Sequence, residues 1–376
     1  MRRIKILFFE QIYTKYVVHL SKTISSDEFN VNYIACLSTQ YWEQSNVAGK
    51  NHRESKIKAL SIPIKTGSRG THFEVISLHF LWYLIKDKPD LVVIDPNPAF
   101  SVFYLLLTKI LGAKILGFTT HIPDKSSLWG KISDFILKFN DFLIDSYVVP
   151  SSVKKQLMIK LGIDSNKINV IGHAIDVEKF QIAENAIKNK ISTQKKIILF
   201  VGRFVCYKGI KYLVESFQLV NEKINGVCLV LIGDGPEKPS INQLIKNLKL
   251  SDDVLQIDNI ANSEIPEYYA EADILVVPSI EPEPFGLVYI EGMSAGKPII
   301  TFNVGGGEQD LIYNQKNGLL VNSKDVNGLA NAIIDLLEDD KKRKQMGMNA
   351  RKFVEENYDI HIIAEKWRKI IRDLVQ

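Results

Sequence analysis

The stretch KIILFVGRFVCYKGIKYLVESFQLV, residues 196–220, decides the fold class of this chain. Its first part, residues 196–201, is a continuous apolar run, as in strands that are buried on both faces of a parallel sheet. After Gly209 the apolar residues fall on one face of a helix, at Ile210, Leu213, Val214, Phe217 and Val220. A buried strand followed by an amphipathic helix is the repeating unit of a doubly wound α/β sheet.

The same alternation continues along the whole chain, so we expect an α/β protein with parallel sheets. Because 376 residues are long for one domain, we expect two. The predicted strands of the first half are 4–9, 31–37, 91–95, 114–118, 146–149 and 168–171. Those of the second half are 196–201, 227–232, 254–257, 273–278, 298–302 and 318–321.

The most polar connection between strands marks the expected domain boundary. We expect a first Rossmann-like domain over residues 1–178, a linker over 179–195 and a second Rossmann-like domain over 196–355. Residues 356–376 have a charged helical pattern, which predicts a C-terminal helix that can pack back on the first domain. In two doubly wound domains that face each other, ligands bind in the cleft at the carboxyl ends of the strands.

The composition, 46% hydrophobic and 24% charged, is that of a folded globular protein. Residues 1–180 hold 23 Lys+Arg and 16 Asp+Glu, a net charge of +7, and the remainder hold 24 and 27, a net charge of −3. Two interpretations remain open: a basic first domain that faces an anionic membrane or a phosphate-bearing substrate, or a bias that serves solubility. Nucleic acid is not an expected partner, because no dense Lys/Arg run is interleaved with aromatic residues.

The cysteines indicate in which cellular compartment the protein is expected. The three cysteines are widely spaced and form no CxxC pair: Cys36, Cys206 and Cys228. This spacing argues against a disulfide framework or a zinc site and fits a reducing cytoplasm.

The most apolar window, 100–118, is broken by Lys109 and Lys114, so we expect a buried helix and strand there. The amphipathic stretch 128–147 either packs on the core or contacts a membrane.

Three loops that follow predicted strands have the composition of anion-binding loops. In GRFVCYKG, residues 202–209, Gly202 allows a sharp turn, and Arg203 and Lys208 are two cations at the start of a helix. A diphosphate fits such a loop, although a solvated loop with two ordinary cations has the same sequence. In IGDGPEKPS, residues 232–240, Gly233 permits close backbone approach to a nucleotide, although a plain βα turn has the same sequence. FNVGGGEQDLI, residues 302–312, places three glycines before another helix.

A fourth loop, EPEPFGLVYIEG over residues 281–292, carries two acids on either side of a helix start. Glu283 lies before the helix, which begins near Gly286, and Glu291 lies on its second turn. A carboxylate can accept hydrogen bonds from both hydroxyls of a vicinal diol, and free amides at a helix start can bind an anion. The alternative is a capped helix with surface acids. Together the four loops suit a ligand with phosphate and hydroxyl groups, as in a nucleotide sugar.

The first half is expected to bind the acceptor. His121 follows the predicted strand 114–118, where its imidazole could contact a sugar hydroxyl or a phosphate, or have a structural role only. Asp95 ends another predicted strand and either lines the acceptor side or caps a turn.

These motifs, in this order, resemble the retaining family-4 glycosyltransferases of GT-B fold, the glycosyl transferases group 1. The resemblance rests on GRFVCYKG, on EPFGLVYIE with its Glu-x7-Glu spacing and on GKPIITFNVGG, together with VVPSSVKKQL and INVIGHAIDVEKF, and extends from about residue 90 to 320. It implies two Rossmann-like domains facing across a cleft, a nucleotide-sugar donor (UDP- or GDP-sugar) bound by the second, and no cofactor or metal ion.

The resemblance also implies roles for individual residues. Arg203 and Lys208 would hold the diphosphate, Glu283 the donor sugar and Glu291 the ribose. Donor-binding backbone is implied at Gly202, Gly233, Phe285, Gly286, Leu287 and Val288. His121 would lie beside the donor sugar and act in catalysis with Arg203, Lys208 and Glu283. The implied activity is hexose transfer, with retention of configuration, to a glycan or lipid-linked acceptor. The implied role is the synthesis of cell-surface polysaccharide, lipopolysaccharide or glycolipid. The implied location is the cytoplasm, or the inner face of the cell membrane as a peripheral protein.

The sequence also departs from the family pattern. The first loop, FFEQIYTKYVVHL, has no glycine pair, and the interdomain link reads His173-Ala174-Ile175-Asp176 where the family has Asn-Gly-Val-Asp. The acceptor side is therefore not assigned by resemblance. Two other functions stay open: a catalytically inactive GT-B partner subunit of a glycosyltransferase complex, and a GT-B sugar-nucleotide epimerase.

Overall fold

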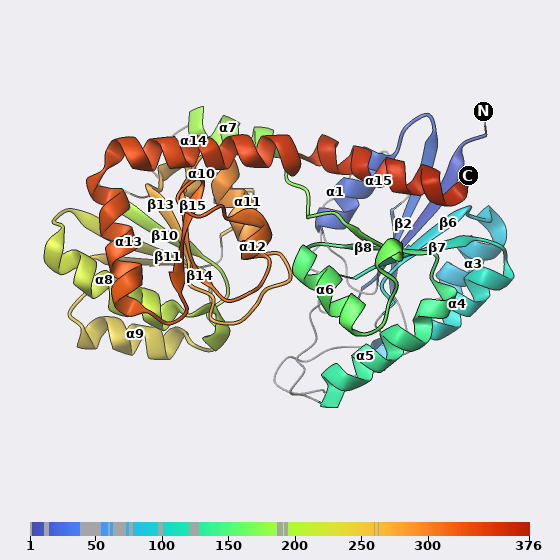
Figure 1. The fold of residues 1–376 in the computed structure, drawn as a ribbon, viewed down its shortest axis with the longest axis horizontal. Coiled ribbons are helices and arrows are strands. Elements are labelled where there is room, and N and C mark those ends of the chain that lie inside the picture. The colour runs from blue at the N-terminus through green and yellow to red at the C-terminus, as the bar shows by residue number, and fades with distance from the viewer. Residues whose placement is uncertain are drawn as a thin grey trace. The chain divides into compact units, whose positions relative to one another are not determined.

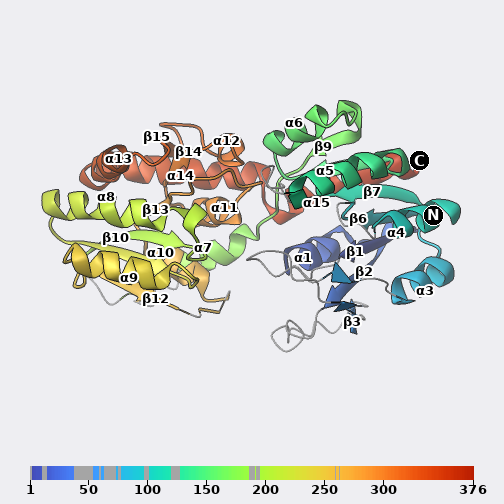
Figure 2. The same ribbon diagram turned by 90° about the horizontal axis from the view of Figure 1, so that it is seen from below.

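The computed structural model of the protein describes residues 2–10, 15–37, 54–58, 61–62, 73–74, 78–96, 101–119, 128–185, 191, 195–258, 260–261 and 263–376. The chain forms two compact units (Figures 1 and 2). Unit 1 comprises residues 1–174 and 361–376, and unit 2 comprises residues 175–360.

Unit 1 is built on a parallel sheet of seven strands in the order β3-β2-β1-β6-β7-β8-β9. Its strands are β1 (Ile4–Glu10), β2 (Phe29–Leu37), β3 (Glu54–Lys58), β6 (Leu91–Ile94), β7 (Lys114–Phe118), β8 (Ser146–Val149) and β9 (Ile168–Val170). A short antiparallel pair is formed by β4 (Ser61–Ile62) and β5 (Phe73–Glu74). Strand β1 pairs with β2 on one side and with β6 on the other, so the strand order reverses between β1 and β6.

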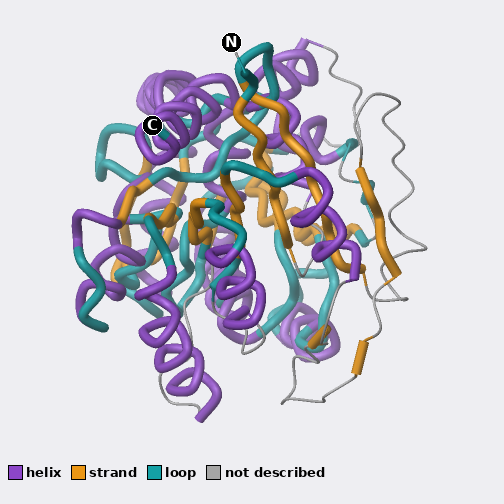
Figure 3. The backbone as a smooth tube through the Cα atoms, turned by 90° about the vertical axis from the view of Figure 1, so that its right-hand side faces the viewer, coloured by secondary structure: helices purple, strands orange, loops and turns teal. Residues whose placement is uncertain are grey.

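Helices pack on both faces of this sheet (Figure 3). They are α1 (Lys15–Ile24), α3 (Leu78–Asp87), α4 (Ser101–Ile110), α5 (Leu128–Asn140), α6 (Ser152–Lys160) and the C-terminal α15 (Ile360–Val375), with the 3-10 helices η2 (Asp141–Leu143) and η3 (Ser165–Lys167). Helix α15 belongs to unit 1 because the buried Trp367 packs on Phe8 and Phe118, with ring centroids 5.7 and 5.3 Å apart. Arg372 also pairs with Glu28 at 2.7 Å.

Unit 2 is built on a parallel sheet of six strands in the order β12-β11-β10-β13-β14-β15. The strands are β10 (Lys196–Val201), β11 (Val227–Ile232), β12 (Val254–Ile257), β13 (Ile274–Val277), β14 (Ile299–Asn303) and β15 (Gly318–Asn322). Alternate residues of β10 enter two separate cores, Ile198 and Phe200 on one face and Ile197 and Leu199 on the other. Burial on both faces explains why these strands read as continuous apolar runs.

The helices of unit 2 connect these strands. They are α7 (Val177–Asn185), α8 (Ile210–Lys223), α9 (Lys238–Asn247), α10 (Ile265–Glu271), α11 (Leu287–Ser294), α12 (Glu308–Leu311), α13 (Val326–Glu338) and α14 (Asp340–Asn357), with the 3-10 helix η4 (Cys206–Lys208). Within the described ranges, no helix is both long and apolar enough to cross a membrane.

The fold confirms the two doubly wound units and all twelve predicted strands, and it corrects three details. Strands β3, β4 and β5 were not predicted. The expected linker, 179–195, begins inside helix α7, because the apolar side chains of Val177 and Phe180 are buried in a core of unit 2. The units divide after Ala174 and after Ile360, where we expected 178 and 355. At these crossings Ile175 and Tyr358 share a backbone hydrogen bond of 2.9 Å.

Candidate functional site

The predicted donor residues gather at the carboxyl ends of β10 and β13. Strand β10 pairs with β11 on one side and β13 on the other, so the strand order of unit 2 reverses here. The helices that follow these two strands, α8 and α11, pack on opposite faces of the sheet. The carboxyl ends of strands at such a reversal are the usual ligand site of an open parallel sheet.

The loops after β10 and β13 are held together by their backbones. Gly209 has φ +67°, and a Cβ atom on it would lie 1.9 Å from the carbonyl oxygen of Pro278, so only glycine fits. The amide of Ile280 also donates to the carbonyl of Tyr207 at 2.8 Å. Lys208 is the last residue of η4, and these contacts hold it beside the loop that carries Glu283.

Lys208 and Glu283 form a partly buried ion pair. The ammonium of Lys208 lies 2.7 Å from Oε2 of Glu283, and their side chains are 13% and 16% exposed. The hydroxyl of Ser279 donates to the other carboxylate oxygen, Oε1. Each side chain keeps a small exposed fraction, and because the two charges are in contact, a ligand that binds one of them lies beside the other. The structure thus brings together two predicted site residues that are 75 positions apart.

Arg203 lies on the outer part of the same loop. Its guanidinium donates to the hydroxyl of Tyr207 at 3.0 Å and is exposed. The ring of Tyr207 in turn lies beside the ammonium of Lys208, 5.7 Å from the ring centroid. The two predicted cations are therefore connected through one tyrosine.

Gly202 and Gly233 allow the loops after β10 and β11 to touch. Gly233 has φ +137°, and a Cβ atom there would lie 2.0 Å from the carbonyl oxygen of Gly202. The amide of Phe204 donates to the carbonyl of Asp234 at 2.9 Å, which continues this contact. This contact gives Gly233 a structural reason that is independent of any ligand, whereas Gly202 contributes only its carbonyl oxygen to it.

The first backbone amides of helix α11 are not capped by the side chain of the N-cap residue. Gly286, the N-cap, has φ +86° and makes no capping hydrogen bond through a side chain. Leu287, the first helical residue, is 40% exposed, whereas the ring of Phe285 is buried and packs on Tyr358 with centroids 5.5 Å apart. The backbone of residues 286–288 is thus the part of this motif that is suited to bind an anion.

Glu291, on the second turn of α11, is held by a tyrosine from another helix. The hydroxyl of Tyr269 on α10 donates to Oε2 of Glu291 at 2.8 Å. Burial raises the pKa of Glu291 above its usual range, and the hydrogen bond from Tyr269 lowers it in part. Burial and the adjacent carboxylate raise the pKa of Tyr269 well above 10, so this tyrosine stays a donor.

The three-glycine loop after β14 packs against the Glu283 segment. The buried carboxylate of Glu308 accepts hydrogen bonds from the amides of Val304 and Gly306, and the amide of Gly307 donates to the carbonyl of Glu283 at 2.8 Å. A Cβ atom on Gly306 would lie 2.7 Å from the amide nitrogen of Glu283. The glycines therefore serve close backbone approach, and the amides of Gly306 and Gly307 are already bonded within the protein.

Three contributors to the site were not predicted: Ser279, Tyr269 and Glu308. Ser279 lies two residues before the predicted loop, and its proximity to Glu283 in sequence was a usable signal. Glu308 directly follows the three glycines, which was also visible. No sequence pattern pointed to Tyr269, because its hydrogen bond to Glu291 joins two helices and two residues 22 positions apart.

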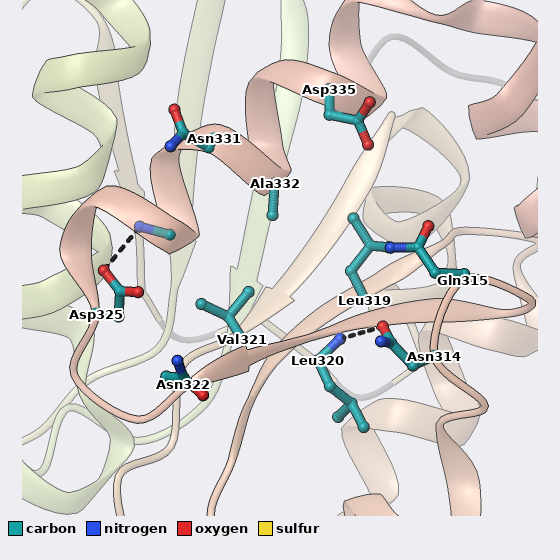
Figure 4. A pocket seen from close by; sticks show the side chains of 11 residues that line it. Asn314, Gln315, Leu319, Leu320, Val321, Asn322, Asp325, Asn331, Ala332 and Asp335 are labelled. Carbon is teal, nitrogen blue, oxygen red and sulfur yellow. Dashed lines mark hydrogen bonds between the residues drawn. The ribbon is translucent and has the colours of Figure 1, made fainter.

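Other features lie apart from these residues. His121 falls outside the described residues, and Asp95 lies at the carboxyl end of β6 in unit 1. A cavity of about 350 Å³ lies between β15 and α13 and is lined by residues such as Asn314, Leu320 and Asp335 (Figure 4). None of the predicted site residues lines it. In the described part of the chain, no group of three His, Cys, Asp or Glu side chains is placed to hold a metal ion.

Comparisons with known proteins agree with this geometry. Residues 181–353 match the family model for glycosyl transferases group 1. The N-acetyl-alpha-D-glucosaminyl L-malate synthase of Bacillus anthracis is 34% identical over 189 residues, which cover 50% of this chain and 48% of that protein. The capsular polysaccharide biosynthesis glycosyltransferase CapM of Staphylococcus aureus is 31% identical over 230 residues, which cover 59% and 60%. The chain thus spans about half to three fifths of the length of these curated relatives.

Among solved structures, Anabaena HepE in complex with UDP superposes with a TM-score of 0.80 at 18% sequence identity, over 99% of this chain and 100% of that one. This likeness concerns the fold and extends over both units. Residues 181–353, within the second unit, therefore match the glycosyl transferases group 1 family, and the chain has the GT-B fold, with its two Rossmann-like units.

Proposed function

We propose that this protein is a glycosyltransferase that transfers a hexose from a nucleotide sugar to a hydroxyl group of a glycan or lipid-linked acceptor. The observation that carries the proposal is the Lys208–Glu283 pair at the point where the strand order of unit 2 reverses. A cation and a carboxylate 2.7 Å apart suit the junction between a phosphate and a sugar, which presents negative charge and hydroxyl donors side by side.

Each predicted residue has a place in this proposal. Lys208 and Arg203 bind the diphosphate, together with the amides at residues 286–288 of α11. Glu283, held by Ser279, accepts hydrogen bonds from the donor sugar, and Glu291, held by Tyr269, accepts them from the ribose hydroxyls.

The chemical step in this proposal is stabilisation of the leaving diphosphate. As the glycosidic bond to phosphate breaks, negative charge grows on the diphosphate oxygens, and preorganised cations and amides lower the energy of that state. The acceptor hydroxyl attacks from the face that the diphosphate leaves and gives its proton to an oxygen of the departing diphosphate, so the configuration at the sugar carbon is retained. Lys208 and Arg203 supply the positive charge, and we propose that no metal ion is required.

The wider role follows from the relatives and from the sequence. The relationship to a capsular polysaccharide glycosyltransferase supports a place in cell-surface polysaccharide or glycolipid synthesis. A solved structure of the same fold binds UDP and a relative from Mycobacterium tuberculosis depends on GDP-mannose, so both UDP-sugars and GDP-sugars are proposed donors. The cytoplasm is the proposed compartment, because Cys206 and Cys228 are free thiols.

The proposal is tested by thermal unfolding with UDP, GDP, ADP and their common sugars, each with and without a divalent metal ion. A ligand at a hundred times its dissociation constant stabilises the folded state by about 2.7 kcal/mol. We expect one nucleotide to raise Tm without metal, and its sugar conjugate to be consumed with release of that nucleotide. A Tm shift without nucleotide release would indicate an inactive partner subunit, and interconversion of sugars without transfer would indicate an epimerase.

A further inference from the structure

Unit 2 has a second cavity, of about 420 Å³, between the start of β13, the turn over residues 296–298 and helix α14. It lies at the amino ends of two neighbouring strands, because its lining includes Asp273, directly before β13, and Pro298, directly before β14. The predicted donor residues follow the carboxyl ends of the strands, so the two sites lie at opposite ends of the same sheet. We call the second one the rear cavity.

The backbones of two segments meet closely beside the rear cavity. A Cβ atom on Gly347 of α14 would lie 2.1 Å from the carbonyl oxygen of Gly296, so a side chain at this position would push the helix away from the turn. A Cβ atom on Gly296 would in turn lie 2.9 Å from the guanidinium of Arg351. The contact between helix and turn therefore fixes how the two walls of the cavity are spaced.

The lining of the rear cavity is strongly cationic. Four cationic side chains and one carboxylate give it a net charge of +3: Lys297, Arg343, Lys344 and Arg351, with Asp273. Arg343 is buried, and its guanidinium pairs with Asp273 at 3.2 Å and with Asp340 at 2.7 Å. Because these two carboxylates compensate Arg343, the charge offered to a ligand is that of the other three cations.

Backbone carbonyls orient two of these three cations. The ammonium of Lys297 donates to the carbonyl of Ala270 at 2.8 Å, and Nε of Arg351 donates to the carbonyl of Ser294 at 3.1 Å. A carbonyl holds a cation in place without supplying a full negative charge. The third cation, Lys344, is exposed and takes part in no ion pair within the part of the chain that the structure describes. The cations thus line the cavity in positions that are set before any ligand arrives.

We propose that the rear cavity binds a small molecule with two or more phosphate groups. Guanidinium and ammonium groups bind phosphate oxygens through charge-assisted hydrogen bonds, and three such groups in one cavity suit a ligand of high negative charge. Lys344 and Arg351 are about 10 Å apart along the axis of α14, by the rise of 1.5 Å per residue, so their side chains can meet two neighbouring phosphates.

The size and the remaining lining define the ligand further. A volume of 420 Å³ is that of a site for a small molecule. None of the described lining residues is aromatic, so a nucleobase would have no ring to stack on, and the phosphates are the groups that are recognised. The rear cavity is separate from the donor site, so the proposal holds or fails independently of the transfer reaction.

The test is calorimetric titration of the full-length protein with pyrophosphate, at an ionic strength kept constant with potassium chloride. Because a diphosphate can also bind at Lys208, the titration is made on Lys208→Ala protein as well as on the wild type. We expect Lys208→Ala protein to bind pyrophosphate, and to bind inorganic phosphate about tenfold more weakly, because one phosphate group reaches fewer of the cations.

Two further substitutions, each made in Lys208→Ala protein, test the rear cavity itself. Lys344→Gln should raise the Kd for pyrophosphate about tenfold, because one charge-assisted hydrogen bond is lost. Met348→Glu should raise it about tenfold or more, because this lining position, 58% exposed, then carries a negative charge. The matched control is Lys352→Gln, also on α14, whose side chain is 74% exposed and does not line the cavity, and it should leave the Kd unchanged.

The Tm of each variant verifies folding. If Lys208→Ala does not fold, the stoichiometry decides, since the wild type should bind two pyrophosphates and Met348→Glu one. The proposal is overturned if the wild type binds pyrophosphate and folded Lys208→Ala protein does not, because the donor site then accounts for the binding. It is also overturned if neither protein binds pyrophosphate, or if Lys344→Gln and Lys352→Gln bind it equally.

Discussion

The ammonium of Lys208 lies 2.7 Å from Oε2 of Glu283, and this pair joins the loop after β10 to the loop after β13. The two side chains are mostly buried, so neither can be removed without leaving the other charge poorly compensated. The pair therefore has a structural role and a functional one. Separating the two roles requires that stability and activity be measured on the same variant.

Replacing Lys208 with alanine should lower kcat/KM for transfer at least about a hundredfold, because a preorganised cation at the leaving group is lost. The uncompensated carboxylate of Glu283 should cost about 1–3 kcal/mol of unfolding free energy, which leaves the protein folded. Steady-state kinetics and urea denaturation measure the two effects. Glu283→Ala should have a similar effect on transfer.

The matched control for this prediction is Lys211→Ala on helix α8. Lys211 is 64% exposed and pairs with Glu215 at 3.7 Å, so its loss should change stability by less than about 0.5 kcal/mol and leave the kinetics unchanged. Wild-type activity in folded Lys208→Ala protein would contradict the assignment of Lys208 to the diphosphate.

Most of the fold was predictable because strands buried on both faces leave continuous apolar runs, as residues 196–201 and 227–232 do. Strand β3, ESKIK, was missed because it is the polar edge strand of its sheet. Helix α7 was missed because the buried residues described on it, Val177 and Phe180, lie within a polar segment. Local pattern thus predicts an element where a long apolar run marks it and fails where the segment is polar.

The sequence predicted which loops form the candidate site, but not which residues hold the side chains of the site in place. Motif residues such as Lys208 and Glu283 follow strands that end at one edge of the sheet, and the parallel topology brings them together. The hydrogen bond from Tyr269 to Glu291 depends on how α10 packs against α11, which no local pattern encodes. The glycines at 306 and 307 belong to a loop that was predicted to bind an anion, but the structure uses their amides internally.

Replacing Glu291 with glutamine should stabilise the protein at neutral pH, although donor binding is weakened. Burial raises the pKa of Glu291 in the folded state, so the ionised carboxylate destabilises the fold wherever the pH exceeds that pKa. As the pH falls through the folded pKa the wild type regains this stability, so the advantage of the variant should shrink.

Urea denaturation of both proteins at neutral and at mildly acidic pH measures this difference. The exposed Glu338→Gln on α13 is the control for the loss of one negative charge, and should show no such pH dependence. A Glu291→Gln variant that is less stable than the wild type at neutral pH would show that the carboxylate is not the destabilising group.

Replacing Tyr269 with phenylalanine should raise KM for the donor about tenfold and change kcat by less than about threefold. Tyr269 orients Glu291, which we assign to the ribose, and a ribose contact contributes equally to the ground state and the transition state. Loss of the hydrogen bond also removes the interaction that lowers the pKa of Glu291, so this pKa should rise in the variant. Because the ionised carboxylate binds the ribose hydroxyls, donor affinity should then begin to fall at a higher pH than in the wild type.

Donor titration by calorimetry across the acidic range would detect this movement, and Tyr268→Phe, also buried on α10, is the control. A Tyr269→Phe variant with lower stability but an unchanged pH profile of donor binding would reduce Tyr269 to a packing role.

Two glycines with similar backbone angles allow the loop contact at Lys208 to be tested separately from backbone strain. Gly209 and Gly226 have φ of +67° and +73°, but a Cβ atom on Gly209 would lie 1.9 Å from the carbonyl oxygen of Pro278, whereas Gly226 has no atom within 4 Å. Gly226→Ala should therefore cost only the strain of a left-handed alanine, about 1–2 kcal/mol. Gly209→Ala should cost about 1–3 kcal/mol more, because the loops must separate.

Separation of the loops also predicts lower activity in Gly209→Ala. Moving η4 away from Pro278 lengthens the distance between Lys208 and Glu283, so the remaining folded protein should bind the donor more weakly, while Gly226→Ala should bind it normally. Chemical denaturation and donor titration on both variants measure this. Equal stability and equal donor affinity would mean that the close contact between the two loops does not set the geometry of the site.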